Sequence, residues 1–298
     1  MRGSILTVAL AVNCLIALAQ DKGALSIAIG PNHGNDNLTW SIAGTLEGTD
    51  PNIYSELKWT KVKSIGFNAN ATYQLTKRFK LKVALLKAYI VAGRVSDYDY
   101  QLDNRQYVSF EGLFDADKGS VTDVSAAAGY QFIKKENWQF NLYAGYGINR
   151  EHLFLRDNNG KYDARLNSTY NTRWHGPLAM AEAVINISMK LSAIPSIIYH
   201  QISYSANGNW NMIDDFEHPV SYRHTAKGFG IMPALQIGYQ LNNQFQFYVN
   251  GGYHYYETGK GIDKLYLNNG QRPETQLNGI TLKAYMVEAG VKLTFVTK

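Results

Sequence analysis

Apolar and polar residues alternate along much of this chain with a period of two. Between positions 138 and 149, one set of alternate residues is Trp138, Phe140, Leu142, Ala144, Tyr146 and Ile148, and the other is Gln139, Asn141, Tyr143, Gly145, Gly147 and Asn149. The same alternation recurs at 65–75 and 245–256. Because successive side chains of a strand point to opposite faces, each segment predicts a strand with one apolar and one polar face.

Similar segments predict a complete set of strands. They lie at 38–46, 79–91, 121–132, 177–191, 194–204, 229–241 and 280–295. The total of about ten is even, as in the barrels of bacterial outer membranes. A soluble β-sandwich also has alternating strands, but it seldom sustains the alternation over such long segments. The predicted fold class is therefore all-β, a transmembrane antiparallel up-and-down β-barrel of about ten strands.

The connections alternate strictly between short and long. Short polar turns are expected at 75–78, 133–137, 191–194 and 241–244, and long connections at 93–120, 150–176, 206–228 and 257–279. Outer-membrane barrels have short periplasmic turns and long extracellular loops. The polar chemistry of the loops is therefore expected at the extracellular mouth.

The first residues have the features of a secretory signal peptide. Arg2 precedes an apolar run over 5–18, and Ala17 and Ala19 suit the cleavage site. The run is shorter than the roughly 20 residues that cross a bilayer as a helix. We therefore expect a signal peptide at 1–19 and one barrel domain at 20–298, with the only cysteine, Cys14, removed by cleavage.

Composition supports export to a membrane without spanning helices. The chain has 21 Tyr, 12 Phe and 5 Trp, yet its mean hydropathy is −0.27 and no other long apolar run occurs. Lipid leaves no partner for an unpaired strand edge, so a membrane protein of this kind must be a closed barrel. The net charge is +5. For an exported chain, anionic lipid or lipopolysaccharide, rather than nucleic acid, is the expected counter-charge.

Two carboxylates stand out in the second long connection, which opens at Gly93. Asp97 and Asp99 lie two residues apart, so in an extended strand both would point inward. Two close carboxylates raise each other's pKa or jointly orient a water molecule, which suits a general base. A solvated loop or a calcium site is the alternative interpretation of the same pattern.

A second cluster lies in the connection at 206–228. It contains Asp214, Asp215, Glu217 and His218, and the next strand begins with Tyr222-Arg223-His224. A carboxylate beside a histidine fixes its tautomer and raises its basicity. Exposed loops also carry such residues for solubility alone. The chain shows no Ser-His-Asp order, zinc-ligand spacing or glycine-rich phosphate loop.

Several short motifs, in order along nearly all of the chain after the signal peptide, resemble the omptin family of outer-membrane aspartyl-type proteases and omptin-like proteins. They are Ile42-Ala43-Gly44-Thr45-Leu46, Ser55-Glu56-Leu57-Lys58-Trp59, Asp97-Tyr98-Asp99, Ala144-Gly145-Tyr146, 219–223 and 289–295. In omptins an aspartate pair faces a His-Asp pair across the barrel mouth, and a water between them attacks the peptide. The resemblance places Asp97 and Asp99 in the first pair.

The second pair departs from the family pattern. Omptins have Asp-x-His, whereas this chain has Asp214-Asp215-Phe216-Glu217-His218, so the resemblance implies Asp214 and His218 as catalytic residues only with altered spacing. The first extracellular loop, 47–52, is shorter than in omptins, and Glu111 falls near an acidic specificity position.

The resemblance also implies a lipopolysaccharide site on the outer wall. Tyr146, Arg150, Arg173 and Lys227 match residues of the omptin site, and Ile148 replaces a family glutamate. Arg and Lys near the outer leaflet suit lipid A phosphates, although the same residues also snorkel to interfaces without a specific ligand. No metal and no cofactor are expected, with lipopolysaccharide as a lipid partner.

Two functions from different classes remain open. One is an omptin-like aspartyl endopeptidase that acts on a peptide at the extracellular mouth. The other is a non-catalytic barrel for adhesion, binding or slow permeation. A general porin needs a wide lumen, which about ten strands do not provide. The closing strand, 285–295, resembles the signal that the barrel-assembly machinery recognises, with three further residues after it.

Overall fold

The computed structural model describes residues 23–157 and 160–296, and the predicted signal peptide lies outside them. The strands are β1 (Ala24–Ile42), β2 (Ser55–Gln74), β3 (Phe79–Leu102), β4 (Gln106–Asp115), β5 (Gly119–Lys134), β6 (Trp138–Arg156), β7 (Asn167–Asn186), β8 (Leu191–Asn209), β9 (Tyr222–Gln240), β10 (Phe245–Thr258), β11 (Gly261–Leu265) and β12 (Glu274–Val296). A single 3₁₀ turn, Asp103–Arg105, joins β3 to β4.

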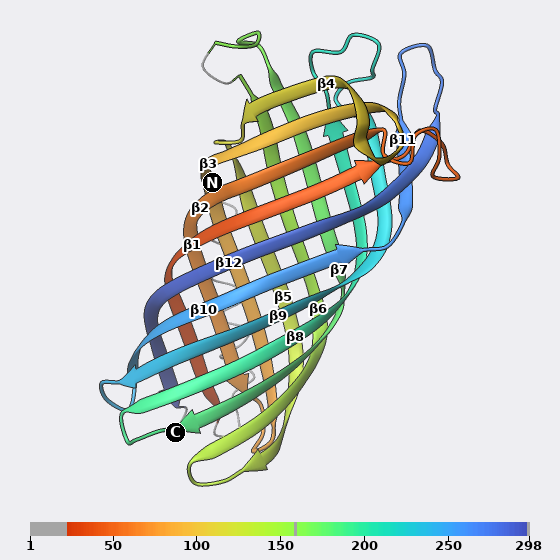
Figure 1. Cartoon of the computed structure of the whole chain (residues 1–298). Coiled ribbons are helices and arrows are strands. Elements are labelled where there is room, and N and C mark those ends of the chain that lie inside the picture. Colours follow the sequence, from red (N-terminus) through yellow and green to blue (C-terminus); the bar gives the residue numbers. More distant parts are fainter. Residues whose placement is uncertain (1–22, 158–159, 297–298) are drawn as a thin grey trace.

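The strands form one antiparallel sheet that closes on itself (Figure 1). The closing pair is β1 with β12, in register from Ala24 opposite Val296 to Ile42 opposite Leu277. β4 and β5 both pair with β3, and β10 and β11 both pair with β9 and β12. β4 and β5 follow each other along the same neighbour, and so do β10 and β11, so each of these two pairs takes the place of one strand in the barrel wall. The twelve strands therefore form a ten-stranded barrel. The predicted up-and-down barrel is confirmed.

Most strands are longer than the alternation predicts, and most of the long connections are correspondingly shorter. Two predicted ends were wrong by several residues in the other direction: β1 ends at Ile42 rather than 46, and β7 ends at Asn186 rather than 191, which moves the turn predicted at 191–194 to 187–190. β3 continues to Leu102 and β4 returns from Gln106, so most of the connection expected at 93–120 is a hairpin. β1 begins at Ala24, well before the predicted 38, through a segment rich in Gly, Pro and Asn. Pairing with β2 on one side and β12 on the other supplies its backbone hydrogen bonds, which outweighs the low strand propensity of these residues.

The outer face carries an apolar belt. Large side chains that are about half exposed line it on every side, among them Phe67, Val83, Leu85, Tyr199, Phe247 and Val287. At the extracellular end of the belt, the last exposed apolar residue on β3 is Val91, and the exposed Arg94 follows it. On β2 the corresponding apolar residue is Ile65, and the exposed Lys63 lies beyond it. Such a continuous exposed apolar band suits lipid rather than water. The strand segments beyond these residues extend past the membrane at the extracellular end. In the described residues, no helix has the length and apolar character needed to span a membrane.

Aromatic side chains fill the extracellular half of the lumen. Trp59, Tyr170 and Trp174 are fully buried. The rings of Trp59 and Tyr170 are stacked with centroids 5.3 Å apart, and those of Trp174 and Tyr204 lie 4.3 Å apart. These contacts supply a packed core above the membrane, which is why the strands extend beyond the belt.

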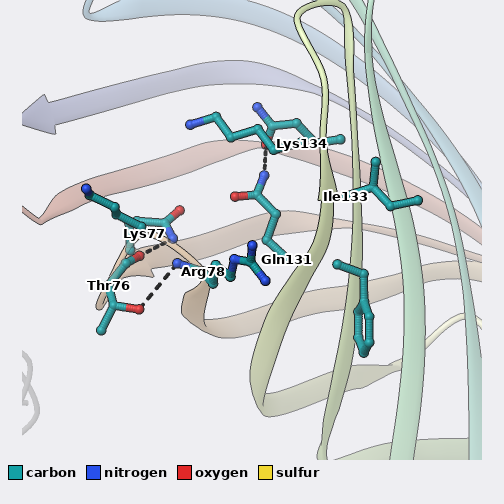
Figure 2. Close-up of a pocket in the computed structure, with 9 residues that line it drawn as sticks. Thr76, Lys77, Arg78, Gln131, Ile133 and Lys134 are labelled. Atoms are coloured by element: carbon teal, nitrogen blue, oxygen red, sulfur yellow. Dashed lines mark hydrogen bonds between the residues drawn. The ribbon is translucent and has the colours of Figure 1, made fainter.

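The periplasmic half of the lumen is polar. Glu182 pairs with Lys82 and accepts hydrogen bonds from Asn141 and Tyr143. Below this network a cavity of about 770 Å³ lies beside the turn between β2 and β3 and the end of β5 (Figure 2). Its lining includes the basic residues Lys77, Arg78 and Lys134.

Candidate functional site

Asp97 and Asp99 lie on the inner face of β3, beyond the apolar belt. Asp97 is opposite the buried Leu57 on β2, is 8% exposed, and has one carboxylate oxygen with no hydrogen-bond partner among the described residues. Burial raises the pKa of Asp97 well above its usual value, and the charge of Asp99 raises it further. Burial also raises the pKa of Asp99, against the opposing effect of a hydrogen bond from Ser55. The two side chains form a carboxylate pair at the mouth, with Asp97 buried and Asp99 half-buried.

His218 and Asp214 lie on the exposed loop between β8 and β9. His218 Nδ1 is 2.7 Å from the Asn209 side-chain oxygen, and within the described part of the chain the histidine makes no ion pair with a carboxylate. The backbone carbonyl of Asp214 accepts a hydrogen bond from Asn268, and Glu217 pairs with Arg272 at 2.5 Å. These groups tie the loop to the next loop, 266–273. The structure does not bring His218 and Asp214 into contact.

A different histidine has a carboxylate partner. His224 on β9 is directly opposite Asp263 on β11, with Nε2 3.1 Å from the carboxylate. Its Nδ1 is 2.8 Å from the hydroxyl of Tyr170, and its ring lies edge-on to Trp40 at 4.8 Å. His224 is fully buried and Asp263 is 6% exposed. The sequence predicts His224 at the start of a strand, but it predicts the region of Asp263 as a loop. The pairing of the two residues was therefore not predicted.

Aromatic rings separate this pair from the aspartates on β3. Burial raises the pKa of Tyr222 well above its ordinary value, and the charges of Tyr170, Asp263 and Asp97 add to the rise. Tyr222 therefore lies within electrostatic reach of carboxylates from both sides of the barrel. Its ring also packs against Trp40 at 5.9 Å and Trp210 at 5.0 Å. The lumen at this level is filled by side chains of the protein itself.

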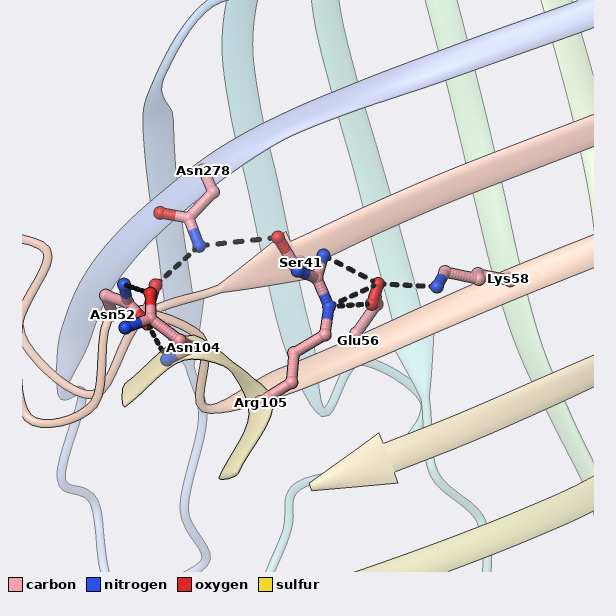
Figure 3. A network of polar contacts seen from close by, with 7 residues as sticks. All are labelled: Ser41, Asn52, Glu56, Lys58, Asn104, Arg105 and Asn278. Carbon is pink, nitrogen blue, oxygen red and sulfur yellow. Dashed lines mark hydrogen bonds and ion pairs between the residues drawn. The ribbon is translucent and has the colours of Figure 1, made fainter. Parts of the chain in front are cut away.

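A polar network fixes the rim beside the aspartate pair (Figure 3). Glu56 is 2% exposed and accepts hydrogen bonds from the guanidinium of Arg105 at 2.9 and 3.1 Å, with Lys58 Nζ at 2.8 Å. Asn52 and Asn104 are joined by two hydrogen bonds, of 2.8 and 3.0 Å. These contacts hold the tip of the β3–β4 hairpin against β2 and the first extracellular loop.

The four residues matched to lipopolysaccharide binding lie on the outer wall of β6, β7 and β9. Arg150 and Arg173 are directly opposite each other on β6 and β7, and both are exposed. The hydroxyl of Tyr146 lies 2.7 Å from His175 Nδ1 just below them. Lys227 on β9 is opposite Ser203 of β8. Within the described residues, none of the three cations pairs with a carboxylate.

The described residues contain no group of three or more His, Cys, Asp or Glu side chains arranged to hold a metal ion.

Solved structures of several outer-membrane barrels are similar to this chain. The outer membrane protease OmpT of Escherichia coli aligns with a TM-score of 0.72 and 16% identity, over 93% of this chain and 98% of that one. OprG of Pseudomonas aeruginosa aligns with a TM-score of 0.37 and 11% identity, over 94% and 99% of the two chains. At 16% identity the likeness to OmpT shows the fold alone, and the predicted resemblance to the omptin fold is confirmed.

No curated protein matches this chain in sequence. A family model described as Protochlamydia outer membrane protein matches residues 29–295. Because that match spans most of the chain, and the barrel carries an apolar belt, this protein belongs to the Protochlamydia outer membrane protein family and is located in the outer membrane.

Proposed function

We propose that this protein is a non-catalytic outer-membrane barrel that binds a partner at its extracellular mouth and is seated in the outer leaflet by lipopolysaccharide. The observation that supports a binding role over proteolysis is the position of His218. Its Nδ1 contacts Asn209, an amide that neither accepts a catalytic proton nor supports an imidazolium charge as a carboxylate does. The Asp97–Asp99 pair thus lacks the opposing His-Asp pair that omptin chemistry requires.

The buried pair His224–Asp263 does not replace the missing one. A general base must come within hydrogen-bond reach of the substrate or of its water. His224 is fully buried, its Nδ1 contacts the Tyr170 hydroxyl, and its Nε2 lies 3.1 Å from the Asp263 carboxylate without the geometry of a hydrogen bond. A peptide would have to displace Trp40 and Tyr222, and removing a buried aromatic ring from such packing costs several kcal/mol, about 3–5 in core substitutions. The pair is better suited to stabilising the core of the mouth.

The cations on the outer wall support lipopolysaccharide binding. Two like charges directly opposite each other on neighbouring strands repel, so Arg150 and Arg173 destabilise the sheet unless an anion lies between them. They lie beyond Tyr146, an exposed apolar-belt residue of β6, and this position on the outer wall supports contact with outer-leaflet headgroups. Guanidinium groups bind phosphate through two parallel hydrogen bonds, which fits the phosphates of lipid A.

Proteolysis is tested with the refolded barrel, lipopolysaccharide and a peptide library. OmpT of Escherichia coli under the same conditions is the positive control. We expect no cleavage by this protein. Cleavage that disappears in the double variant Asp97→Ala, Asp99→Ala would refute the non-catalytic assignment, and it would establish an endopeptidase with a rearranged histidine.

Lipopolysaccharide binding is tested with the double variant Arg150→Ala, Arg173→Ala. The matched control is Lys63→Ala, which removes an exposed cation at the same edge of the belt on β2, on another part of the wall. Each charged hydrogen bond contributes about 1.5–3 kcal/mol, so the double variant should bind lipopolysaccharide at least about 10-fold more weakly than the control. Equal affinity of the two variants would remove the lipid part of the proposal.

A further inference from the structure

β4 has a free edge above the membrane. On one side it pairs with β3, from Arg94 opposite Asp115 to Leu102 opposite Gln106. On the other side only Asp115 pairs, with Arg156 of β6. Within 23–157 and 160–296, the remainder of β4 has no strand on that side, whereas the strands around it close into the ring (Figure 1).

The backbone of this edge presents groups for a further strand. The N–H of Leu113 donates to the Tyr162 hydroxyl at 3.0 Å, so it points away from β3. Residues two apart in an antiparallel strand direct their backbone groups to the same side. The N–H and C=O of Glu111 therefore also point away from β3. They are the unpaired groups onto which an added strand would bond.

The side chains of the edge strand do not protect it. Proteins usually blunt an exposed edge with lysine, proline, a β-bulge or a covering loop. β4 has one bulge, at Ser109, so its regular edge begins at Phe110. The segment Gln106–Glu111 contains neither lysine nor proline and is exposed throughout, with Tyr107 69%, Val108 50% and Phe110 42% exposed. Aromatic and β-branched residues of this kind favour strand pairing. Tyr162 covers only the end of the edge near Leu113.

The hairpin is held in place before any partner binds. Arg105 at its tip is bonded to Glu56, and the Tyr98 hydroxyl donates to Glu111 at 2.7 Å across β3 and β4. On the inner face, a methyl group at Gly112 would lie 2.4 Å from the Phe114 ring and 3.1 Å from the Phe110 ring, so the two rings cover this glycine. A rigid edge lowers the entropic cost of binding, because less of the protein has to be ordered.

We infer that β4 binds an extended peptide by strand addition along Phe110–Leu113, the part of the edge beyond the bulge at Ser109. The chemistry of the edge specifies the peptide. The peptide residue that lies directly across from Glu111 has its side chain on the same outer face as Glu111. A positive charge at that residue is favourable beside the carboxylate, so the residue is basic. Its neighbours fall on the inner face beside Phe110, so they are apolar. The partner is an extended segment that alternates basic and apolar residues. This inference deepens the proposed binding role and rests on it.

The test uses the refolded full barrel and a fluorescein-labelled seven-residue peptide in which lysine and valine alternate. Glu111→Pro removes the free N–H of the edge and adds a ring there, while the β3 ladder does not use that N–H. Glu111→Ala is the matched control, because it loses the same carboxylate and the same bond to Tyr98 but keeps the N–H. We expect Glu111→Ala to bind about 2–5-fold more weakly than the unaltered protein, and Glu111→Pro at least about 10-fold more weakly than Glu111→Ala.

A second measurement does not depend on the proline variant folding. The same peptide, N-methylated at the lysines or at the valines, cannot form a ladder on its methylated edge. We expect the two N-methylated peptides to differ, with at least one losing binding to the unaltered barrel.

Equal binding of Glu111→Pro and Glu111→Ala, or of all the peptides, would overturn strand addition. A third outcome is that the labelled peptide does not bind, while the unaltered barrel forms dimers that Glu111→Pro abolishes. This outcome would refute a peptide as the ligand of the edge and would assign the edge to a second copy of the chain. None of these results depends on the cleavage or lipopolysaccharide assays, so the failure of this inference and the failure of the proposed function are distinguishable.

Discussion

Replacement of Arg105 by alanine tests whether the rim network holds the β3–β4 hairpin. The tip contains Asn104, Arg105 and Tyr107 with φ of 60°, 61° and 56°, in the left-handed region that costs non-glycine residues free energy. The contacts of Glu56 must offset that cost. Without the guanidinium, the buried carboxylate keeps only Lys58, and the tip loses its tie to β2.

The size of the effect follows from the geometry. Arg105 donates two charged hydrogen bonds, at 2.9 and 3.1 Å, to a carboxylate that is 2% exposed. Each such bond contributes about 1.5–3 kcal/mol, but the Arg105 side chain is half exposed, so solvent screening reduces the total. A net loss of about 2 kcal/mol in the free energy of local opening corresponds to about 30-fold faster opening of the tip.

Amide hydrogen exchange of residues 102–108, followed by mass spectrometry, measures this opening. We expect about 30-fold faster exchange in Arg105→Ala and an intermediate rate in Arg105→Lys, which keeps the charge but not the paired hydrogen bonds. Peptides from β7, far from the rim, are the internal control. Unchanged exchange at 102–108 in Arg105→Ala would show that the network does not hold the hairpin.

The same contact predicts a pH dependence. Burial raises the pKa of Glu56, but the hydrogen bonds and charges of Arg105 and Lys58 outweigh it, so the pKa of the folded protein lies below the ordinary value. A depressed folded-state pKa gives stability that is present above the unfolded pKa and lost as the pH falls through the folded one. The ratio of exchange rates between Arg105→Ala and the unaltered protein should therefore shrink toward one at low pH.

Three further predictions concern the barrel core. Asp263→Asn leaves His224 without its charged partner and should lower the free energy of unfolding in urea by about 3 kcal/mol, whereas Asp214→Asn on the exposed loop should leave it unchanged. Trp174→Ala creates a cavity among buried rings and should cost about 3–5 kcal/mol in the same assay; a loss below 1 kcal/mol would contradict the packed lumen. Gly119→Ala would place a methyl group 1.9 Å from the His152 carbonyl oxygen at φ of 133°, so its refolding yield should fall well below that of the unaltered chain.

Much of the fold could be predicted because alternation is a local property. The residues of β6 and β10 show it without any partner, and the belt residues follow directly from it. The ends of the strands could not be predicted in the same way. β4 and the start of β1 carry weak or polar patterns, and they are strands because neighbouring strands pair with them, β1 on both sides and β4 along β3.

The candidate site also has one part that the local sequence predicts and one part that it does not. Asp97 and Asp99 lie two residues apart on one strand, so the period of two alone puts both on the inner face. The histidine pairing is long-range in the chain. His224 meets Asp263, whose separation in sequence carries no signal, because their contact depends on the register of β9 with β11.

A transmembrane barrel with an apolar belt and an inward carboxylate pair follows from the order of the residues alone, since these features depend on which face each side chain takes within a strand. The aromatic filling of the lumen, the pairing of His224 rather than His218 with a carboxylate, and the free edge of β4 become visible in the folded barrel. They depend on register between strands and packing across the lumen, which join residues far apart in the chain and leave no local pattern.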